Sequence, residues 1–266
     1  MQKIIILFTT LIFFVGCASS PLNRRQVVIY SEAEMAAQGE RSYRQIQQEV
    51  PISTNTSEIN YVQCVTDYVI EALDPRVESR NQWEVTLFSE NQANAFALPG
   101  GKIGVYAGLL DVAINQHQLA AVIAHEVGHV IANHSNERAS QNAIRDVGVA
   151  VARILDVDDT TLEAIDMGAR YGFFLPFNRT QESEADSIGI ILMAEAGFDP
   201  EQSVELWLRM NSNSGPRPPE FISTHPAPET RIADLNRRMQ EAQSIRQLAN
   251  NTGRNPDCVP GIASPR

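Results

Sequence analysis

Residues 117–134 decide the fold, and they read HQLAAVIAHEVGHVIANH. The stretch is rich in Ala, Val and Ile over several turns, a composition typical of a buried helix. His125 and His129 stand four residues apart, so a helix places them on one face, one turn apart. Two neutral imidazoles in that arrangement can bind one zinc ion. The stretch therefore predicts a buried helix that carries part of a metal site.

The residue after the first histidine indicates the chemistry of such a site. Glu126 can reach a water molecule on the metal rather than the metal itself. Zinc lowers the pKa of that water from about 15.7 toward about 7, and a carboxylate then takes its proton while a peptide carbonyl is attacked. The His-Glu-x-x-His pattern also arises by chance, so the prediction needs a third ligand.

Candidates for the third ligand lie on a second predicted helix, residues 180–196, which Gly197 and Pro200 end. Glu182 and Asp186 share one face of this helix, so one can bind the metal while the other orients an imidazole. The alternative is a solvated acidic helix face. We favour the ligand interpretation because a catalytic zinc needs three protein ligands and an open fourth position.

The remaining patterns predict an α+β fold that is mostly helical and has one small sheet. Residues 83–87 alternate apolar and polar side chains, as a half-buried strand does. Two more strands are predicted at 94–98 and 102–106, around a Pro-Gly-Gly turn. Ser31 and Glu34 form a capping-box pattern at the start of a helix. Further helices are expected at 59–73, 137–155, 201–210 and 229–248, with loops at 171–177 and 215–219.

Four elements together resemble one family of zinc metallopeptidases. They are the motif at 125–129, Glu182-x-x-x-Asp186, the stretch NAFALPGG at 94–101, and His225-Pro226 followed by Arg231. The family comprises the HtpX heat-shock proteases, the CAAX prenyl endopeptidases and the Oma-type mitochondrial proteases. Within it, the chain looks most like the periplasmic lipoprotein members and the BepA-type outer-membrane assembly proteases.

The resemblance implies a zincin-like domain with one zinc ion per chain. The resemblance implies that Glu182 is the third ligand and that Glu184 is not a ligand. It also implies that Asp186 and Arg231 orient the ligands without binding the metal. It also implies that the substrate chain lies along the strand 102–106, as a free edge that would hold an extended backbone beside the zinc cleft.

His225 lies on a loop stiffened by Pro226 and Pro228. By the resemblance it either donates a hydrogen bond to the developing oxyanion or occupies the fourth metal position and keeps the enzyme latent. The alternative is an ordinary solvated loop histidine. The sequence leaves the three interpretations open.

Other residues near the motif have simpler interpretations. His134 comes nine residues after His125, so on a continuous helix it points to the opposite side, where it would pack or cap. His117 is expected at the surface. Three phenylalanines could line a substrate groove, although aromatics beside such a helix more often belong to the core: Phe173, Phe174 and Phe177.

The first residues of the chain read as a targeting segment. Residues 1–16 combine a basic start with an apolar run shorter than the ~20 residues of a membrane-spanning helix, as in a secretory signal peptide. Cys17 follows a glycine, which resembles a bacterial lipoprotein box and predicts a lipid anchor, with residues 17–30 as a tether. Ala18 favours the outer membrane by the usual sorting rule. We therefore expect a lipid-anchored protein on the periplasmic side of the cell envelope; ordinary signal cleavage with an incidental cysteine is the alternative.

The two remaining cysteines and the charge add two expectations. Cys64 and Cys258 lack the spacing of a Cys-rich zinc site, and in an oxidising compartment they can form a disulfide that pins the polar tail, residues 251–266. Two free thiols are the alternative. The formal net charge is −11, or −12 after loss of Lys3 with the signal peptide, and no Lys/Arg block occurs. This charge argues against nucleic acid as a partner.

Together these features predict a zinc endopeptidase domain at residues 31–250, with Glu126 as general base. Unfolded or misassembled envelope proteins are the expected substrates. A cleft that binds the substrate through its backbone depends little on the substrate's amino-acid sequence. The rival is a chaperone-like envelope lipoprotein with a latent or closed zinc site. The intact Glu126 argues against the rival, because a purely structural metal needs no general base.

Overall fold

The computed structural model describes residues 17–154, 177–212, 220–226 and 230–260. The described chain is mostly helical and has two small sheets, in agreement with the predicted α+β class. Residues 1–16 and the predicted loops at 171–176 and 215–219 lie outside the described residues. None of the described helices is long and apolar enough to cross a membrane.

The first half of the domain follows its local sequence signals. Helix α2 (Glu32–Glu49) begins with the predicted capping box, in which Ser31 and Glu34 each accept the other's backbone N–H. Helix α3 (Thr56–Glu71) buries the apolar face expected for residues 59–73 and leads through the short α4 (Pro75–Glu78) into the sheet.

The main sheet contains β3 (Glu84–Phe88), β4 (Ala95–Leu98) and β5 (Lys102–Tyr106) in the order β3-β5-β4. Strand β5 runs parallel to β3 and antiparallel to β4. The expectation that residues 102–106 form a free edge is therefore wrong, because β5 is the central strand. Its first four residues are all buried, as a strand with neighbours on both sides requires. The edge beside the functional site is β4.

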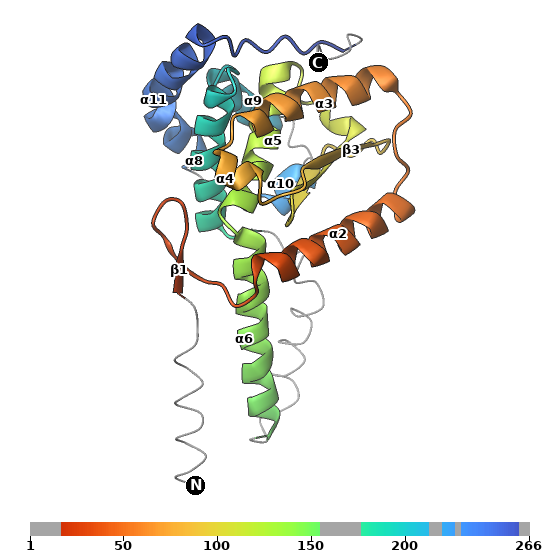
Figure 1. Cartoon of the computed structure of the whole chain (residues 1–266), viewed down its shortest axis with the longest axis vertical. Coiled ribbons are helices and arrows are strands. Elements are labelled where there is room, and N and C mark those ends of the chain that lie inside the picture. The colour runs from red at the N-terminus through yellow and green to blue at the C-terminus, as the bar shows by residue number, and fades with distance from the viewer. Residues whose placement is uncertain (1–16, 155–176, 213–219, 227–229, 261–266) are drawn as a thin grey trace.

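The central helix of the fold is α5 (Gln116–Ile131), which Asn115 caps and in which residues 118–129 are all buried. The sequence predicted one continuous helix to His134, but the chain breaks at Asn133, whose φ is 54°. Asparagine tolerates this left-handed conformation better than most residues. Helix α6 (His134–Ile154) then starts in a new direction and extends away from the body of the molecule (Figure 1).

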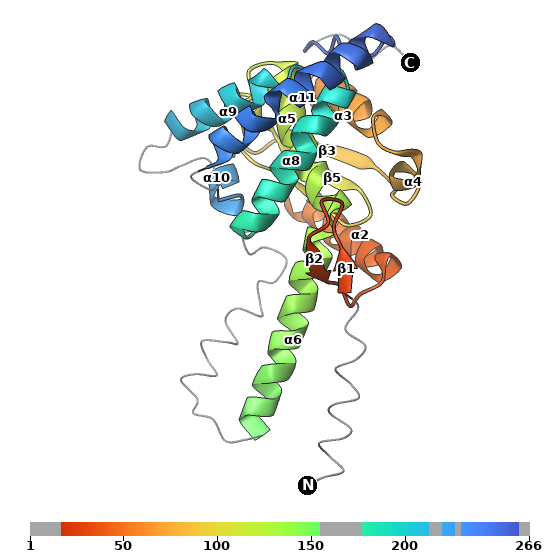
Figure 2. The same cartoon turned by 90° about the vertical axis from the view of Figure 1, so that its left-hand side faces the viewer.

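The second half adds α8 (Arg179–Glu195), α9 (Glu201–Ser212), α10 (Glu220–Thr224) and α11 (Arg231–Asn251). Helix α8 ends at Gly197, as predicted, with a φ of 90°. The short α10 was not predicted. Figure 2 shows α11 crossing α8 and α9 on the outside of the fold, with α5 behind them.

The segment expected as a loose tether contains a short hairpin. Strands β1 (Cys17–Ser19) and β2 (Arg25–Val27) pair antiparallel, and the hairpin lies beside the first turns of α6 (Figure 2). Gln26 donates a hydrogen bond to the carbonyl of Ala132 at 2.6 Å, at the break between α5 and α6. Residues 17–27 thus belong to the folded domain.

The predicted disulfide is confirmed. Cys64 of α3 and Cys258 of the tail are joined, across a sequence separation of 194 residues. Both residues are buried, so the bond fixes the end of the described chain to the core.

We predict that removing this bond lowers the melting temperature, because the bond restricts the unfolded chain. The chain-entropy model gives up to about 5 kcal/mol for a loop of this length, and native-state effects reduce the value. Thermal unfolding of a Cys64→Ser, Cys258→Ser variant, compared with the wild type with and without reductant, measures the effect. A wild-type melting temperature that reductant leaves unchanged would contradict the prediction.

Candidate metal centre

Four potential metal ligands from three parts of the chain meet in the interior. Helix α5 supplies His125 and His129, α8 supplies Glu182, and the segment just after α10 supplies His225. One donor atom from each residue lies within 4.8 Å of the others. All four side chains are buried.

The distances among these donor atoms define a compact polyhedron. Nε2 of His125 lies 3.1 Å from Nε2 of His129, and Glu182 oxygens lie 3.4 and 3.5 Å from those two nitrogens. Nδ1 of His225 lies 3.4 Å from Nε2 of His125 and 3.1 Å from Oε1 of Glu182. Tetrahedral zinc with bonds of about 2.0–2.1 Å separates its ligand atoms by about 3.3–3.4 Å. The donor set therefore fits one tetrahedral zinc ion.

Glu126 lies beside the cluster without belonging to it. Its Oε2 accepts the backbone N–H of Ala97 in β4 at 3.1 Å. Its Oε1 is 3.2 Å from Nε2 of His225, yet within the described chain this buried oxygen has no partner that satisfies hydrogen-bond geometry. Burial raises the pKa of Glu126, and the nearby histidines partly oppose the rise. A buried carboxylate oxygen with a free lone pair suits a group that accepts a proton.

Arg231 holds two of the carboxylates around the cluster. Its Nε donates to Asp186 at 2.5 Å and its Nη2 donates to Glu182 at 2.6 Å. The guanidinium also lies over the ring of Trp207, 3.8 Å from the centroid. Asp186 in turn lies 2.9 Å from Nδ1 of His125, which leaves Nε2 of that ring directed at the cluster.

The electrostatics of the cluster favour a cation. Burial alone would raise the pKa of Glu182, but the contacts with His125, His129 and His225 hold it well below its usual value. Burial would likewise lower the pKa of His125, but Asp186 and Glu182 raise it to about 10. Burial dominates at His129 and lowers its pKa well below the usual value, so this imidazole is neutral. The raised pKa of His125 means that Glu182 and Asp186 favour a positive charge at this position, which a bound metal ion would supply in place of the proton.

His134 does not point away from the site as predicted. Its Nδ1 lies 2.8 Å from Nδ1 of His129, and its ring is completely buried. The prediction assumed a continuous helix, and the left-handed turn at Asn133 reverses the direction of the side chain. A His-x-x-x-x-His spacing across an Ala-Asn pair was the only sequence signal for this contact.

Glu184 is not among the four clustered donors, as the resemblance implied. It lies 3.2 Å from Nε2 of His134 and 2.6 Å from Nε of Arg24. Burial alone would raise its pKa, but its hydrogen bonds, with that from His134 the strongest, lower it to about 2. Arg24 was missed by sequence reasoning because it lies in the segment expected as a tether.

The other aromatic predictions have mixed outcomes. Phe177 stacks on the ring of His129 with centroids 3.7 Å apart, so it packs against the cluster. Phe173 and Phe174 lie outside the described residues. His117 is half-buried rather than on the surface, and its Nδ1 accepts the backbone N–H of Asp199 at 3.2 Å.

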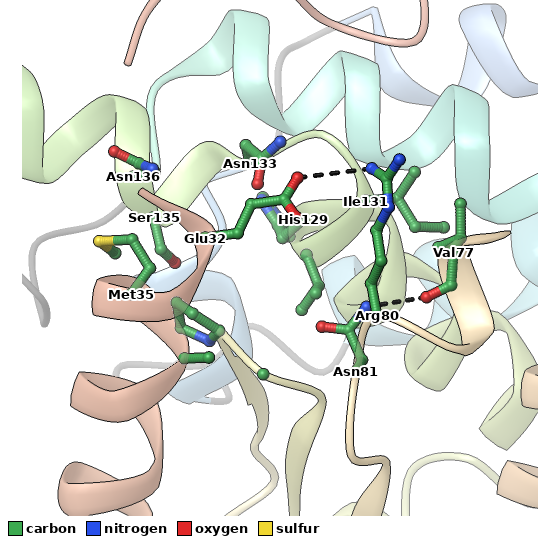
Figure 3. Close-up of a pocket in the computed structure, with 14 residues that line it drawn as sticks. Glu32, Met35, Val77, Arg80, Asn81, His129, Ile131, Asn133, Ser135 and Asn136 are labelled. Atoms are coloured by element: carbon green, nitrogen blue, oxygen red, sulfur yellow. Dashed lines mark hydrogen bonds and ion pairs between the residues drawn. The ribbon is translucent and has the colours of Figure 1, made fainter. Parts of the chain in front are cut away.

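A pocket of about 90 Å³ lies next to His129, at the end of β4. Its walls come from the start of α2, from the region of α4, from the β4–β5 turn and from the α5–α6 junction (Figure 3). Glu32 and Arg80 reach toward each other across it and form an ion pair at 3.4 Å. The pocket thus borders both the cluster and the end of the edge strand.

Comparison with known proteins agrees with this geometry. Residues 57–239 match the model of the family described as peptidase family M48. The chain belongs to this family. It is 37% identical over 171 residues to the mitochondrial metalloendopeptidase OMA1 of Schizosaccharomyces pombe, which covers 63% of this chain and 50% of that protein. It is 31% identical over 218 residues to the Saccharomyces cerevisiae protein of the same name, covering 76% and 62%.

A bacterial relative is also similar. The β-barrel assembly-enhancing protease of Escherichia coli K12 is 33% identical over 172 residues, which covers 60% of this chain and 35% of that protein. The chain thus spans between about a third and less than two-thirds of the length of these relatives.

The relatives correct the expected location. Five of them, from yeasts, a plant and mammals, are mitochondrial proteins by name. The expectation of a lipid-anchored protein on the periplasmic side of an outer membrane is wrong on this comparison. Lipidation of Cys17 itself is a prediction that the described structure does not test.

We predict that His125→Ala, His129→Ala and Glu182→Ala each lose most of the bound zinc, because each removes one of the converging donors. Glu126→Gln is the matched control, since it changes a buried carboxylate outside the donor set and should keep zinc near one ion per chain. Metal analysis of the purified proteins measures both. Full zinc in Glu182→Ala would show that the third ligand is wrongly assigned.

Proposed function

We propose that this chain is a zinc-dependent endopeptidase in which Glu126 is the general base. The observation that carries the proposal is the buried Oε1 of Glu126, which has no hydrogen-bond partner within the described chain and lies beside four donors that converge within 4.8 Å of one another. A site built only to bind metal would not need that carboxylate. The M48 family match agrees with the proposal.

The residues divide the chemistry between them. His125, His129 and Glu182 would hold the ion. When bound, zinc supplies a Lewis acid that polarises the peptide carbonyl and acidifies water. Glu126 takes the proton from the attacking water and passes it to the leaving amine. The backbone N–H of Ala97 donates a hydrogen bond to Oε2 of Glu126, so Oε1 is the oxygen that accepts the proton and passes it on.

The edge strand β4 supports an extended polypeptide as substrate. The carbonyls of Asn94 and Leu98 accept hydrogen bonds from Tyr106 and Gly101 and so face β5. Backbone direction alternates along a strand, so the N–H and C=O groups of Ala95 and Ala97 face the opposite way. Ala97 indeed directs its N–H to Glu126. A chain added along this edge would be held by its backbone beside the metal site.

This mode of binding favours unfolded or misassembled proteins. Backbone hydrogen bonds read conformation rather than sequence, and a folded protein rarely offers a free extended segment. The pocket beside His129 at the end of β4 would receive one substrate side chain.

His225 in its present position supports a latent form of the enzyme. Its Nδ1 lies 3.4 Å from Nε2 of His125 and 3.1 Å from Oε1 of Glu182, the spacing expected between ligands of one metal ion. It therefore occupies the fourth metal position, which substrate must enter. Phe221 stacks on the ring with centroids 4.6 Å apart and accepts the backbone N–H of His225 at 2.9 Å. We propose that substrate displaces His225 from the metal.

We predict that His225→Ala raises basal cleavage of an unfolded substrate, because it frees the fourth position. Steady-state kinetics of the wild type and the variant measure this. A fall in turnover of about 10²-fold or more would instead identify an oxyanion donor. Unchanged kinetics would make His225 an ordinary loop residue, and either result would contradict the latch.

We predict that the wild type cleaves an unfolded protein such as reduced, alkylated ribonuclease and leaves the folded, disulfide-bonded form intact. Glu126→Gln should lower cleavage by at least 10²-fold with zinc retained, since a general base contributes about 10²–10⁴-fold. Gel and mass-spectrometric analysis of fragments measures both. Equal cleavage of the two forms would contradict the backbone-binding proposal.

The rival function, a chaperone-like protein with a closed metal site, rests on the same position of His225. Glu126→Gln distinguishes the two. If this variant replaces the wild type fully in a strain that lacks the protein, proteolysis is not its role and the chaperone interpretation holds.

A further inference from the structure

Nδ1 of His129 belongs to a series of hydrogen bonds that starts outside the four-donor cluster. Nδ1 of His129 and Nδ1 of His134 lie 2.8 Å apart, so one ring nitrogen donates and the other accepts. Nε2 of His134 lies 3.2 Å from Oε2 of Glu184. An ionised carboxylate only accepts hydrogen bonds, so a neutral His134 carries its proton on Nε2 and accepts through Nδ1. His129 therefore donates from Nδ1, and its Nε2 lone pair is left for the metal.

The β1–β2 hairpin anchors the far end of this series of hydrogen bonds. Nε of Arg24 donates to Glu184 at 2.6 Å, and its two terminal nitrogens donate to both oxygens of Glu137 at 2.7 Å. Gln181 also donates to Glu137 at 2.9 Å. His134, Glu137 and Glu184 are at most 5% exposed, whereas the side chain of Arg24 is 24% exposed, so the acceptors are buried and the arginine closes the site toward the surface.

The two ligand histidines are supported in the same way. Nδ1 of His125 lies beside Asp186, a carboxylate that Arg231 binds. His129 reaches Glu184, a carboxylate that Arg24 binds, but it does so through the ring of His134. Each of the two imidazoles is thus connected by hydrogen bonds to a carboxylate that an arginine binds. Of the two connections, the one from His129 depends on the N-terminal hairpin.

We propose that His134 and Glu184, held by Arg24, are positioning residues that fix the tautomer and ring orientation of His129 for metal binding. The proposal rests on the proposed function only in taking His129 as a ligand. Outer hydrogen-bond partners of this kind typically contribute 10–100-fold to metal affinity. If His134 merely filled space, any side chain of similar volume would replace it.

The test compares His134→Leu with His134→Asn. Leucine fills the space without an acceptor, whereas the asparagine carbonyl can accept the hydrogen bond from Nδ1 of His129. Zinc dissociation constants, from competition with a chromophoric chelator, are measured beside the melting temperatures of the metal-free proteins. We expect about 10–100-fold weaker zinc binding in His134→Leu. His134→Asn should stay within a few-fold of the wild type.

Arg24→Ala extends the test to the hairpin, in case His134→Leu fails to fold. Its matched control is Arg44→Ala, because Arg44 makes a similar two-pronged ion pair with Glu84, far from the cluster. Only Arg24→Ala should weaken zinc binding. Equal affinities in the two arginine variants, or equal losses in the leucine and asparagine variants, would overturn the proposal. The proposed function would fail separately, if His129→Ala kept its zinc.

Discussion

The cluster of four potential metal ligands depends on the close approach of α5 and α8. A Cβ atom on Gly128 would lie 3.0 Å from the carbonyl of Ala185, and one on Gly189 would lie 3.0 Å from the backbone nitrogen of His125. Both contacts are tighter than side chains normally allow, so glycine at these two positions lets the helix backbones touch. This packing brings Glu182 of α8 against the imidazoles of α5. The short glycine contacts, rather than the motif alone, therefore position the third donor.

Burial makes the charges of the site interdependent. Glu182, Asp186 and Arg231 are each at most 6% exposed, and unpaired charges at such depth would be costly. Arg231 binds both carboxylates, and Glu182 also contacts the three clustered histidines. Loss of one partner would leave a buried charge without compensation. The same dependence joins the hairpin to the site, because Arg24 compensates Glu137 and Glu184.

What the sequence could predict was local. The two candidate metal ligands on α5, His125 and His129, follow from a spacing of four residues, and the capping box of α2 follows from Ser31 and Glu34 alone. The disulfide followed from the count of cysteines rather than from their positions. Long-range features were less accessible: strand order is decided by pairing between distant segments, so the periodicity of β5 did not reveal that it is central.

Two misses at the site have distinct causes. His134 was placed on the wrong side because a helical projection assumes one unbroken helix, and a single left-handed residue, Asn133, invalidates it. Arg24 lies 160 residues from Glu184 in sequence, in a polar segment without periodicity. Glu182 was identified only through the family resemblance, since spacing on α8 left it equal to Asp186.

X-ray absorption at the zinc edge of the purified protein tests the metal centre most directly. We expect four nitrogen or oxygen neighbours of zinc at about 2.0–2.1 Å, with the multiple scattering of three imidazoles. His225→Ala should show two imidazoles and the same remaining ligands. A sulfur neighbour at about 2.3 Å, or a protein that binds no zinc at all, would show that these four residues do not form a zinc site.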